Sequence, residues 1–381
     1  MLVFTSKTRL AFFHRFETIP VIVDRMKQFQ ICLFSLYLVS FLWTLPAKPT
    51  KLNHRIPQKK SESIALLVAI QESIQYLQKL PMDSKFLIHG ETITLNEILF
   101  PLRDIQKQIQ GNKNFDLLGE IRKQFKEVEL KPNSEPPLIT GYYEVRVQGR
   151  TKPSGKYLYP ALVSPKENSK ETHSKSYPRE YWKEESHWKT VSHPIVYLTL
   201  TDLHLAQLEG SALVQTETKE IFRINYASDN GFDYLSPAVH LTGVCPTLKP
   251  YELKFCMETN PKEVSEAIWK NPRYIFFEKE ILPKKQLSDQ MIGPLGSGGI
   301  RLVPERSVAM DKQIPLGFPV LVSFKSIQQT YNDHLVFVHD RGNAIQGEGR
   351  VDFYLGNESG VDKLANQLLS KGKVILFVPK K

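Results

Sequence analysis

Hydrophobic residues first follow a helical spacing, after the N-terminal region of the chain. Leu66, Ile70 and Leu77 recur at the 3.6-residue period of one helix face. Ser61 and Ser63 precede this run and are candidate N-cap residues. The sequence therefore predicts a helix that ends shortly before Pro81. Two further stretches with the same period cover residues 95–109 and 117–128.

From about residue 138 the pattern changes to short apolar runs separated by Gly and Pro, which is typical of strands. Clear examples are residues 194–200 and 334–338. Residues 166–189 are highly polar and favour an exposed excursion. No internal repeat is visible. The pattern predicts a mainly β protein with N-terminal helices. Further helices are expected at 261–271 and 361–369, the first before a strand at 273–280 and the second within a strand-rich stretch from 300 to 379.

The N-terminus carries a largely apolar run from Ile31 to Leu45, flanked by lysines. Its length of about fifteen residues is short of the ~20 that span a bilayer and suits the core of a secretory signal. Met26 would be a normal start for such a signal, and cleavage after Ala47 is conceivable. An uncleaved membrane anchor and a buried helix are the alternatives. Residues 48–60, rich in Lys and Pro, are expected to form a linker.

Composition narrows the function only a little. The 381 residues suffice for two domains, and the net charge of +10 favours polyanionic surroundings. The lysines are spread along the chain, and no helix-turn-helix or RNA-binding motif occurs, so nucleic acid is not expected as a partner.

Two cysteines, Cys245 and Cys256, remain if a signal is removed. In an exported protein they would form a disulfide or stay as two buried thiols, and the sequence leaves both open. Neither a CxxC nor an HExxH motif occurs, and the histidines are scattered. No metal and no other cofactor is therefore expected.

The stretch VHDRGNAIQGEGRVDFYLG, residues 338–356, places Asp340 and Asp352 at the two ends of a Gly-rich connection between strand-like runs. Gly342, Asn343, Gly347 and Gly349 tolerate positive φ, so we expect the chain to fold tightly back there. Two acids among apolar strand residues can have their pKa values pushed apart, which is a basis for acid–base catalysis. The alternative is an ordinary turn.

Other Gly-containing segments combine polar and aromatic residues. PLITGYYE at 137–144 would suit a sugar, or would be an aromatic core strand. QLEGSA at 207–212 and NYASDNGFDYLS at 225–236 are explained by turn chemistry, and Asn230-Gly231 is a strong hairpin motif. A long segment at 293–322 places Asp311 before another strand, which gives three aspartates at strand edges.

In this order the segments TGYYE, EGSA, YASDNG, NPRYIFF, GPLGSGGIRLVPERSVAMDKQIPLGFPVLV and HDRGNAIQGEGRVDFYLG resemble the membrane-bound lytic transglycosylase A (MltA) family over roughly residues 60–380. The C-terminal part resembles the module named for three aspartates. The resemblance implies a double-psi β-barrel with an inserted smaller β-domain. The barrel would take residues 60–145 and 245–380, and the insert 146–244.

The resemblance also implies non-hydrolytic cleavage of the β-1,4 bond between N-acetylmuramic acid and N-acetylglucosamine in peptidoglycan, which leaves a 1,6-anhydro ring. Asp352 would be the catalytic acid and base, Asp340 would shape the site and tune it, and Asp311 would be structural. The residues expected to bind the saccharide are Thr140, Gly141 and Tyr142, with Glu209, Gly210 and Ser211 opposite. The partners would be glycan strands and an envelope membrane, and the protein would be a monomer of the bacterial cell envelope.

Two departures from the family pattern bear on activity. The usual DxGGAIKG has Asn343 and Gln346 in place of a Gly and a Lys, and the usual QGSGR is reduced to EGSAL at 209–213. A non-catalytic peptidoglycan-binding protein of the same fold is therefore the alternative function. An aspartic protease would need a second DTG-like motif as a counterpart to Asp340-Arg341-Gly342, and the chain has none.

Overall fold

In the computed structural model the described residues are 58–111, 116–132, 135–165, 177–282, 293–342, 345–358 and 360–381. The expected signal or anchor, with Met26, lies outside them, as does most of the expected linker. Within these ranges no helix has both the length and the apolar character needed to cross a membrane.

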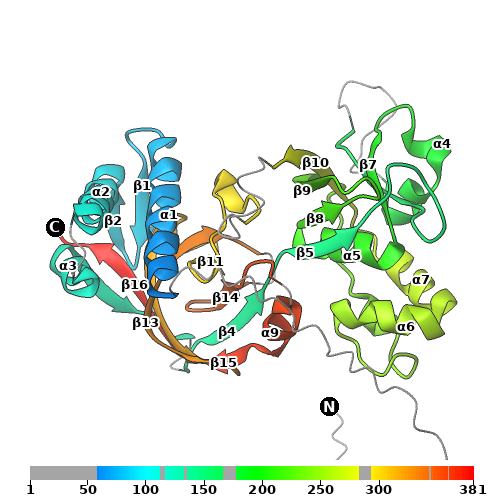
Figure 1. The fold of residues 1–381 in the computed structure, drawn as a ribbon. Coiled ribbons are helices and arrows are strands. Elements are labelled where there is room, and N and C mark those ends of the chain that lie inside the picture. Colours follow the sequence, from blue (N-terminus) through cyan, green and yellow to red (C-terminus); the bar gives the residue numbers. More distant parts are fainter. Residues whose placement is uncertain are drawn as a thin grey trace, which may run out of the picture. The chain divides into compact units, whose positions relative to one another are not determined.

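The larger of the sheets has eight strands of mixed direction (Figure 1). Two neighbouring pairs, β4 with β14 and β11 with β13, are parallel, and the other neighbours are antiparallel. No pairing among the described strands joins the two edges of the sheet. From edge to edge the strands are β15 (Leu369–Lys371), β4 (Leu138–Tyr142), β14 (Val351–Tyr354), β11 (Ser307–Met310), β13 (Thr330–Asp340), β12 (Pro319–Lys325), β16 (Lys373–Pro379) and β3 (Phe125–Glu129).

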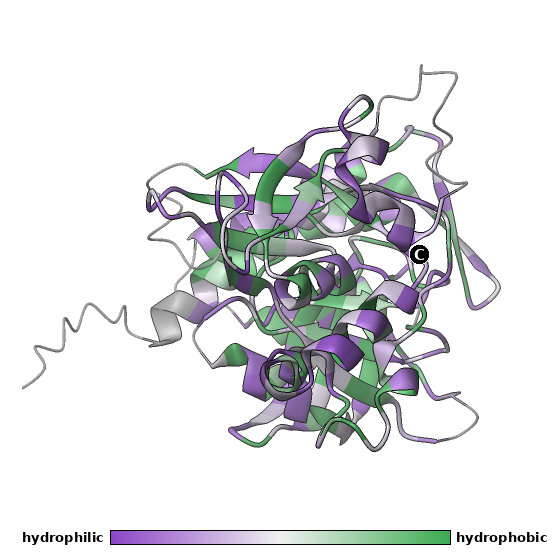
Figure 2. Cartoon of the chain, turned by 90° about the vertical axis from the view of Figure 1, so that its right-hand side faces the viewer, coloured by the Kyte–Doolittle hydropathy of each residue, from purple (hydrophilic) through white to green (hydrophobic). Residues whose placement is uncertain are grey.

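N-terminal helices and a hairpin pack on this sheet and share its core. α1 (Gln58–Gln78) and α2 (Leu95–Gly111) bury their apolar faces against β-strand residues such as Phe337. The hairpin between them is β1 (Lys85–Ile88) and β2 (Glu91–Thr94). Figure 2 shows that the helices and strands carry both hydrophobic (green) and hydrophilic (purple) residues. The predicted first helix is confirmed, but it begins at Gln58, so Ser61 and Ser63 lie within it and do not cap it.

The third predicted helix is shorter than expected. α3 (Leu117–Gln124) begins after Asp116, whose side chain accepts a hydrogen bond from the Gly119 amide. The chain then continues as β3, which pairs with β16. The prediction of a helix to residue 128 is wrong because Phe125–Glu129 pairs as an edge strand with its side chains alternating between buried and more exposed.

A second sheet has four strands: β10 (Ile275–Ile281), β9 (Ile221–Asp229), β8 (Ser211–Gln215) and β5 (Val145–Gln148). Beside it lie the pair β6 (Tyr159–Leu162) and β7 (Pro194–Leu198), and the helices α5 (Leu200–Glu209), α6 (Leu253–Thr259) and α7 (Pro261–Lys270) (Figure 1). The predicted helices at 261–271 and 361–369 are confirmed as α7 and α9 (Val361–Gln367). α9 contributes apolar side chains to the core of this sheet.

Three local predictions need correction in this region. The run at 194–200 is a strand only to Leu198, because Thr199 accepts a hydrogen bond from the Asp202 amide and caps α5. Asn230-Gly231 does not form a hairpin. The buried Asn230 side chain instead donates to the carbonyls of Tyr177 and Pro272.

The third correction concerns the excursion. In residues 177–189, which form the described part of it, most polar positions are exposed as predicted, but Trp182 and Trp188 are buried in an aromatic cluster with Tyr274 and Phe276. Around them are the short helices η3 (Arg179–Lys183) and α4 (Glu185–Trp188). Elsewhere, Cys245 and Cys256 are joined in a disulfide, which decides the question that the sequence left open.

Candidate active site

Four residues on adjacent strands of the eight-stranded sheet form one row. Thr140 of β4 is the register partner of Asp352 of β14. Asp352 is also the partner of Ala309 of β11, and Ala309 is the partner of Asp340 of β13. The two aspartates are therefore two strand spacings apart, about 10 Å between backbones. The predicted direct fold-back between them is wrong, because β11 lies between β13 and β14. The small side chain of Ala309 separates the two acids.

Asp352 is a half-buried carboxyl group with one close hydroxyl. Thr140 Oγ1 donates to its Oδ1 at 2.8 Å. Burial raises the pKa of Asp352 from 3.8 to about 6, and the charge of Asp340 adds to the rise, while the Thr140 bond and the charge of Arg350 oppose it. This carboxyl group is therefore able both to donate and to accept a proton near neutral pH.

Asp340 is held by more hydrogen bonds. The backbone amide and the hydroxyl of Ser297 donate to Oδ1 at 3.0 and 2.9 Å, and the Tyr142 hydroxyl donates to Oδ2 at 3.3 Å. Burial raises the pKa of Asp340, and these bonds act against the rise. Two donors fixed on one oxygen make Asp340 the more rigid of the two acids.

Ser297 was not singled out in the sequence, although its segment was. It opens η6 (Ser297–Gly299), and Gly296 before it lies close to the His339 carbonyl. A Cβ at Gly296 would be 2.7 Å from that oxygen, so only glycine lets the loop approach Asp340. The position of this serine within the glycine-rich run Gly296–Gly299 was the feature of the sequence that could have identified it.

The residue before Asp340 fixes the strand from behind. His339 is fully buried and lies within hydrogen-bonding distance of two hydroxyls, Ser73 Oγ at 2.9 Å and Ser307 Oγ at 2.7 Å. Burial lowers the pKa of His339 to about 3, so the ring is neutral. Through this ring α1, β11 and β13 are tied together directly behind the acid row.

The Gly-rich connection is organised by Asp311. Its carboxylate accepts hydrogen bonds from the backbone amides of Gln313 at 2.9 Å and Gly347 at 2.7 Å, and these bonds lower its pKa. Gly347 and Gly349 have φ of 98° and 75°. Gly342 does not have positive φ, and Asn343 lies outside the described residues. Asp311 thus contacts the connection and not the acid row.

Of the residues expected to bind saccharide, Thr140 and Tyr142 contact the two acids. Gly141, between them, faces the other way. A Cβ there would be 2.9 Å from a Leu355 side-chain carbon and 3.2 Å from the Ala365 Cα in α9. Gly141 is therefore required for the packing of α9 against β4.

Glu209, Gly210 and Ser211 lie where α5 ends and β8 begins, and Gly210 closes the helix with φ of 76°. Burial raises the pKa of Glu209 to about 8, and the charge of Asp352 contributes. Glu209 is thus electrostatically coupled to the acid row. Ser211 is buried, only 4% exposed, so its side chain does not face solvent.

A metal centre has no support in the described part of the chain, where no cluster of three or more His, Cys, Asp or Glu side chains could hold an ion. The site consists of hydrogen-bonded carboxyl groups, two of them with raised pKa in one row. Such an arrangement is typical of proteins that perform acid–base chemistry with carboxyl groups.

Comparison with protein families identifies this class further. Residues 138–278 match the MltA specific insert domain, and residues 306–378 match the 3D domain. The chain belongs to the MltA family and carries a 3D domain. A search of the curated proteins gave no match.

Solved structures agree in fold. MltA from Neisseria gonorrhoeae is 19% identical with a TM-score of 0.66, covering 84% of this chain and 88% of that one. The membrane-bound lytic murein transglycosylase from Agrobacterium tumefaciens is 18% identical with a TM-score of 0.64, covering 84% and 94%. E. coli MltA with bound chitohexaose is 18% identical with a TM-score of 0.64, covering 85% and 91%. At these identities the likeness establishes a shared sheet-rich fold with helices.

Proposed function

We propose that this chain is a lytic transglycosylase that cleaves the β-1,4 bond between N-acetylmuramic acid and N-acetylglucosamine in peptidoglycan. The observation that carries the proposal is the row of Thr140, Asp352, Ala309 and Asp340. Family membership supports the same activity, and a solved relative with bound chitohexaose supports a glycan strand as the ligand.

Asp352 performs both proton transfers in this mechanism. Its protonated carboxyl group donates to the glycosidic oxygen as the bond from that oxygen to C1 of the muramic acid breaks. The C6 hydroxyl oxygen of the same sugar then bonds to C1, and its proton passes to the Asp352 carboxylate. The acid is thereby restored, the 1,6-anhydro ring is closed, and no water is consumed.

The intramolecular attack suits the geometry of the row. A nucleophile on the substrate itself has a high effective molarity, so no second carboxylate is needed to activate water. A single acid with a pKa of about 6 can serve in both directions near neutral pH. Asp340, held by Ser297 and Tyr142, keeps the site in place and raises the pKa of its neighbour.

The saccharide would contact Thr140 and Tyr142 on one side and the α5–β8 turn with Glu209 on the other. The coupling of Glu209 to Asp352 supports this arrangement. We assign Gly141, Ser211 and Asp311 structural roles because of their packing, burial and hydrogen bonds. The alternative of a non-catalytic binding protein gains no support from the acid row, which retains both carboxyl groups.

We further propose that the eight-stranded sheet corresponds to the double-psi β-barrel of the family, which its two parallel pairs favour. The division at 60–145, 146–244 and 245–380 stays a prediction. The pairing of β10 with β9 favours an insert that continues to about residue 281. We place the enzyme in the bacterial cell envelope, where its substrate lies.

The test is digestion of purified sacculi and mass spectrometry of the released muropeptides. Products with 1,6-anhydro ends, lighter than hydrolysis products by the mass of one water, are expected. Products with ordinary reducing ends would mean hydrolysis, and no release would favour the binding protein.

Asp352→Asn should reduce release by about 10²–10⁴-fold, because the variant can neither donate nor accept the proton. Its fold is expected to stay intact, as measured by circular dichroism. Asp311→Asn is the matched control and should retain most of the activity. Undiminished release by Asp352→Asn would refute the assignment of the acid.

A further inference from the structure

Exposed apolar side chains are unevenly distributed over the described residues. Fifteen large hydrophobic residues are exposed there, and six of them fall in one short stretch of the insert region. Single exposed apolar residues are ordinary, whereas a group of them marks a surface that contacts something other than water. The six are Tyr234, Leu235, Val239, Val244, Leu248 and Phe255.

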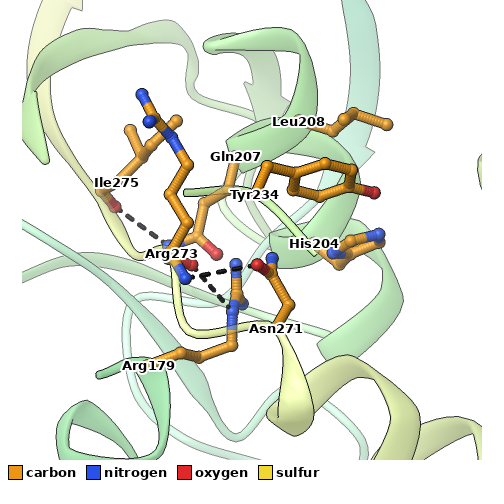
Figure 3. A pocket seen from close by; sticks show the side chains of 8 residues that line it. All are labelled: Arg179, His204, Gln207, Leu208, Tyr234, Asn271, Arg273 and Ile275. Atoms are coloured by element: carbon orange, nitrogen blue, oxygen red, sulfur yellow. Dashed lines mark hydrogen bonds between the residues drawn. The ribbon is translucent and has the colours of Figure 1, made fainter. Parts of the chain in front are cut away.

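The first of these residues, Tyr234, borders a small polar pocket together with Arg179 and His204 (Figure 3). The cavity volume of this pocket is about 10 Å³, which is room for about one water molecule. The pocket therefore does not explain the apolar residues that follow Tyr234 in the sequence.

A disulfide gathers four of the six residues. Val244 and Phe255 directly precede Cys245 and Cys256, whose Cα atoms are 5.6 Å apart across the bond. Leu248 lies in the loop that the bond closes, and Val239 lies just before this loop, in the short helix η4 (Pro237–His240). We call Val239, Val244, Leu248 and Phe255 the apolar patch.

The apolar patch is not a part of the core that failed to pack. Leu253 and Cys256 of α6 face inward and form a small core with Leu241 and with residues of α7. Phe255, between them in the sequence, is 58% exposed, and Val239 is 60% exposed. The inner face of this segment is thus already filled, and the apolar patch belongs to its outer face.

Lysines stand directly beside the apolar patch. Lys249 follows Leu248, and Lys254 Nζ lies 5.2 Å from the centre of the Phe255 ring. Both lysines are exposed. Of the two acids in the same segment, Glu252 is half-buried, and Glu258 is exposed near the end of α6.

Around the patch the cations extend further. The charges of Lys254 and Lys156 both act on the half-buried carboxyl group of Asp202, so the loop that carries Lys156 lies near α6. The whole chain has a net charge of +10. A surface that combines apolar side chains with lysines on a cationic protein is complementary to a bilayer with anionic headgroups.

The sequence also holds an apolar run near this part of the chain. Residues 46–57, which connect Ile31–Leu45 to the start of α1, number twelve and can span at most about 40 Å. If the run stays in the membrane as an anchor, this short connection raises the effective concentration of the rest of the chain at the bilayer surface.

We propose that the apolar patch docks the protein on the surface of a lipid bilayer that contains anionic lipids. Its apolar side chains enter the boundary between headgroups and acyl chains, and the ammonium groups of Lys249 and Lys254 reach the lipid phosphates. The patch residues stand on turns and short helices, so they enter as single side chains. The docking concerns where the enzyme is held and not which bond it cleaves.

The test is amide hydrogen exchange, followed by mass spectrometry, on the whole chain with vesicles of phosphatidylethanolamine and phosphatidylglycerol. Because Ile31–Leu45 can bring every variant to the vesicles, exchange is compared peptide by peptide. Amides of residues 239–256 should exchange at least about threefold more slowly with vesicles than without them. Vesicles of phosphatidylcholine, which lack anionic headgroups, should slow them less.

Phe255→Gln should lose most of this slowing. The matched control is Phe100→Gln, which removes a ring from α2 that is also 58% exposed and should leave the slowing unchanged. Both side chains are exposed, so neither variant is expected to disturb the fold.

Unchanged exchange at 239–256 in the presence of vesicles would overturn the proposal, as would equal slowing around Phe100. Equal slowing by soluble polyphosphate would mean that the segment binds anions and not a bilayer. Slowing that grows with protein concentration in the absence of vesicles would mean that a second copy of the chain covers the patch, which would also overturn the proposal.

Discussion

The described residues contain two clusters of buried or half-buried carboxyl groups, and they differ in whether a cation accompanies the acids. In the first, Glu144 receives two hydrogen bonds from Arg223 and a third from Asn357, and Glu280 pairs with Arg301 at 2.8 Å. In the second, Asp340, Asp352 and Glu209 have hydroxyl and amide donors but no ion pair with a described residue.

The paired cluster is structural in position. It joins Glu144, which directly precedes β5, and residues of β9 and β10 to Asn357, which follows β14, and to Arg301, which precedes β11. Both carboxylates are paired with guanidinium groups. In the unpaired cluster burial instead raises the pKa of each acid. The comparison leads us to expect acid–base chemistry at acids in low-dielectric surroundings that form no ion pair.

Glu144→Gln should have the largest effect on stability, since it removes the carboxylate that receives two hydrogen bonds from the buried Arg223. Breaking a buried pair in this way costs about 3–5 kcal/mol. Urea denaturation measures the loss. The matched control is Glu135→Gln, whose exposed pair with Lys371 should contribute little to stability. Equal losses in the two variants would remove the distinction between the clusters.

Asp352→Asn should change the stability in the opposite direction and make the protein more stable at neutral pH. The pKa of Asp352 is higher in the folded chain than its ordinary 3.8, so the folded chain holds the proton more tightly than the unfolded chain. Stability therefore falls as pH rises from about 4 to about 6, and the loss is complete above that range.

The variant should thus gain up to about 3 kcal/mol at about pH 7.5, and this gain should vanish at about pH 4. Thermal denaturation at both pH values tests it. A variant less stable than the parent at the higher pH would contradict the raised pKa of Asp352.

Thr140→Val should have the smallest effect. Valine keeps the shape and the strand preference of threonine and removes only the 2.8 Å bond to Asp352. Because that bond stabilises the carboxylate, its loss should raise the pKa of Asp352 by up to about one unit and move the alkaline limb of the activity profile upward. A profile that moves to lower pH would contradict this role of the hydroxyl.

Much of the acid row was predictable from the sequence, because Asp340, Asp352, Thr140 and Tyr142 lie in short segments rich in glycine and aromatic residues. The insertion of β11 between the aspartates was not, since strand order depends on pairing between distant segments. Ser297 was missed because its role depends on a loop that approaches Asp340 from a distant part of the chain.

The polar stretch that holds Arg179 was predicted only in part. Its charges suggested solvent exposure, which most of the described positions have, yet Trp182, Trp188 and Arg179 itself are buried. Because the stretch is polar on average, its hydropathy gave no sign that Trp182 and Trp188 are buried. A buried charge of this kind can be recognised only when the three-dimensional neighbours are known.

The most direct test of the unpaired acid cluster is the pKa of Asp352, measured by NMR titration of the 13C-labelled aspartate carboxyl groups, with Asp352→Asn used to assign the signal. The signal should titrate with a pKa of about 6. A pKa at or below the ordinary 3.8 would mean that Asp352 is ionised at neutral pH, and it could not then be the acid that protonates the glycosidic oxygen.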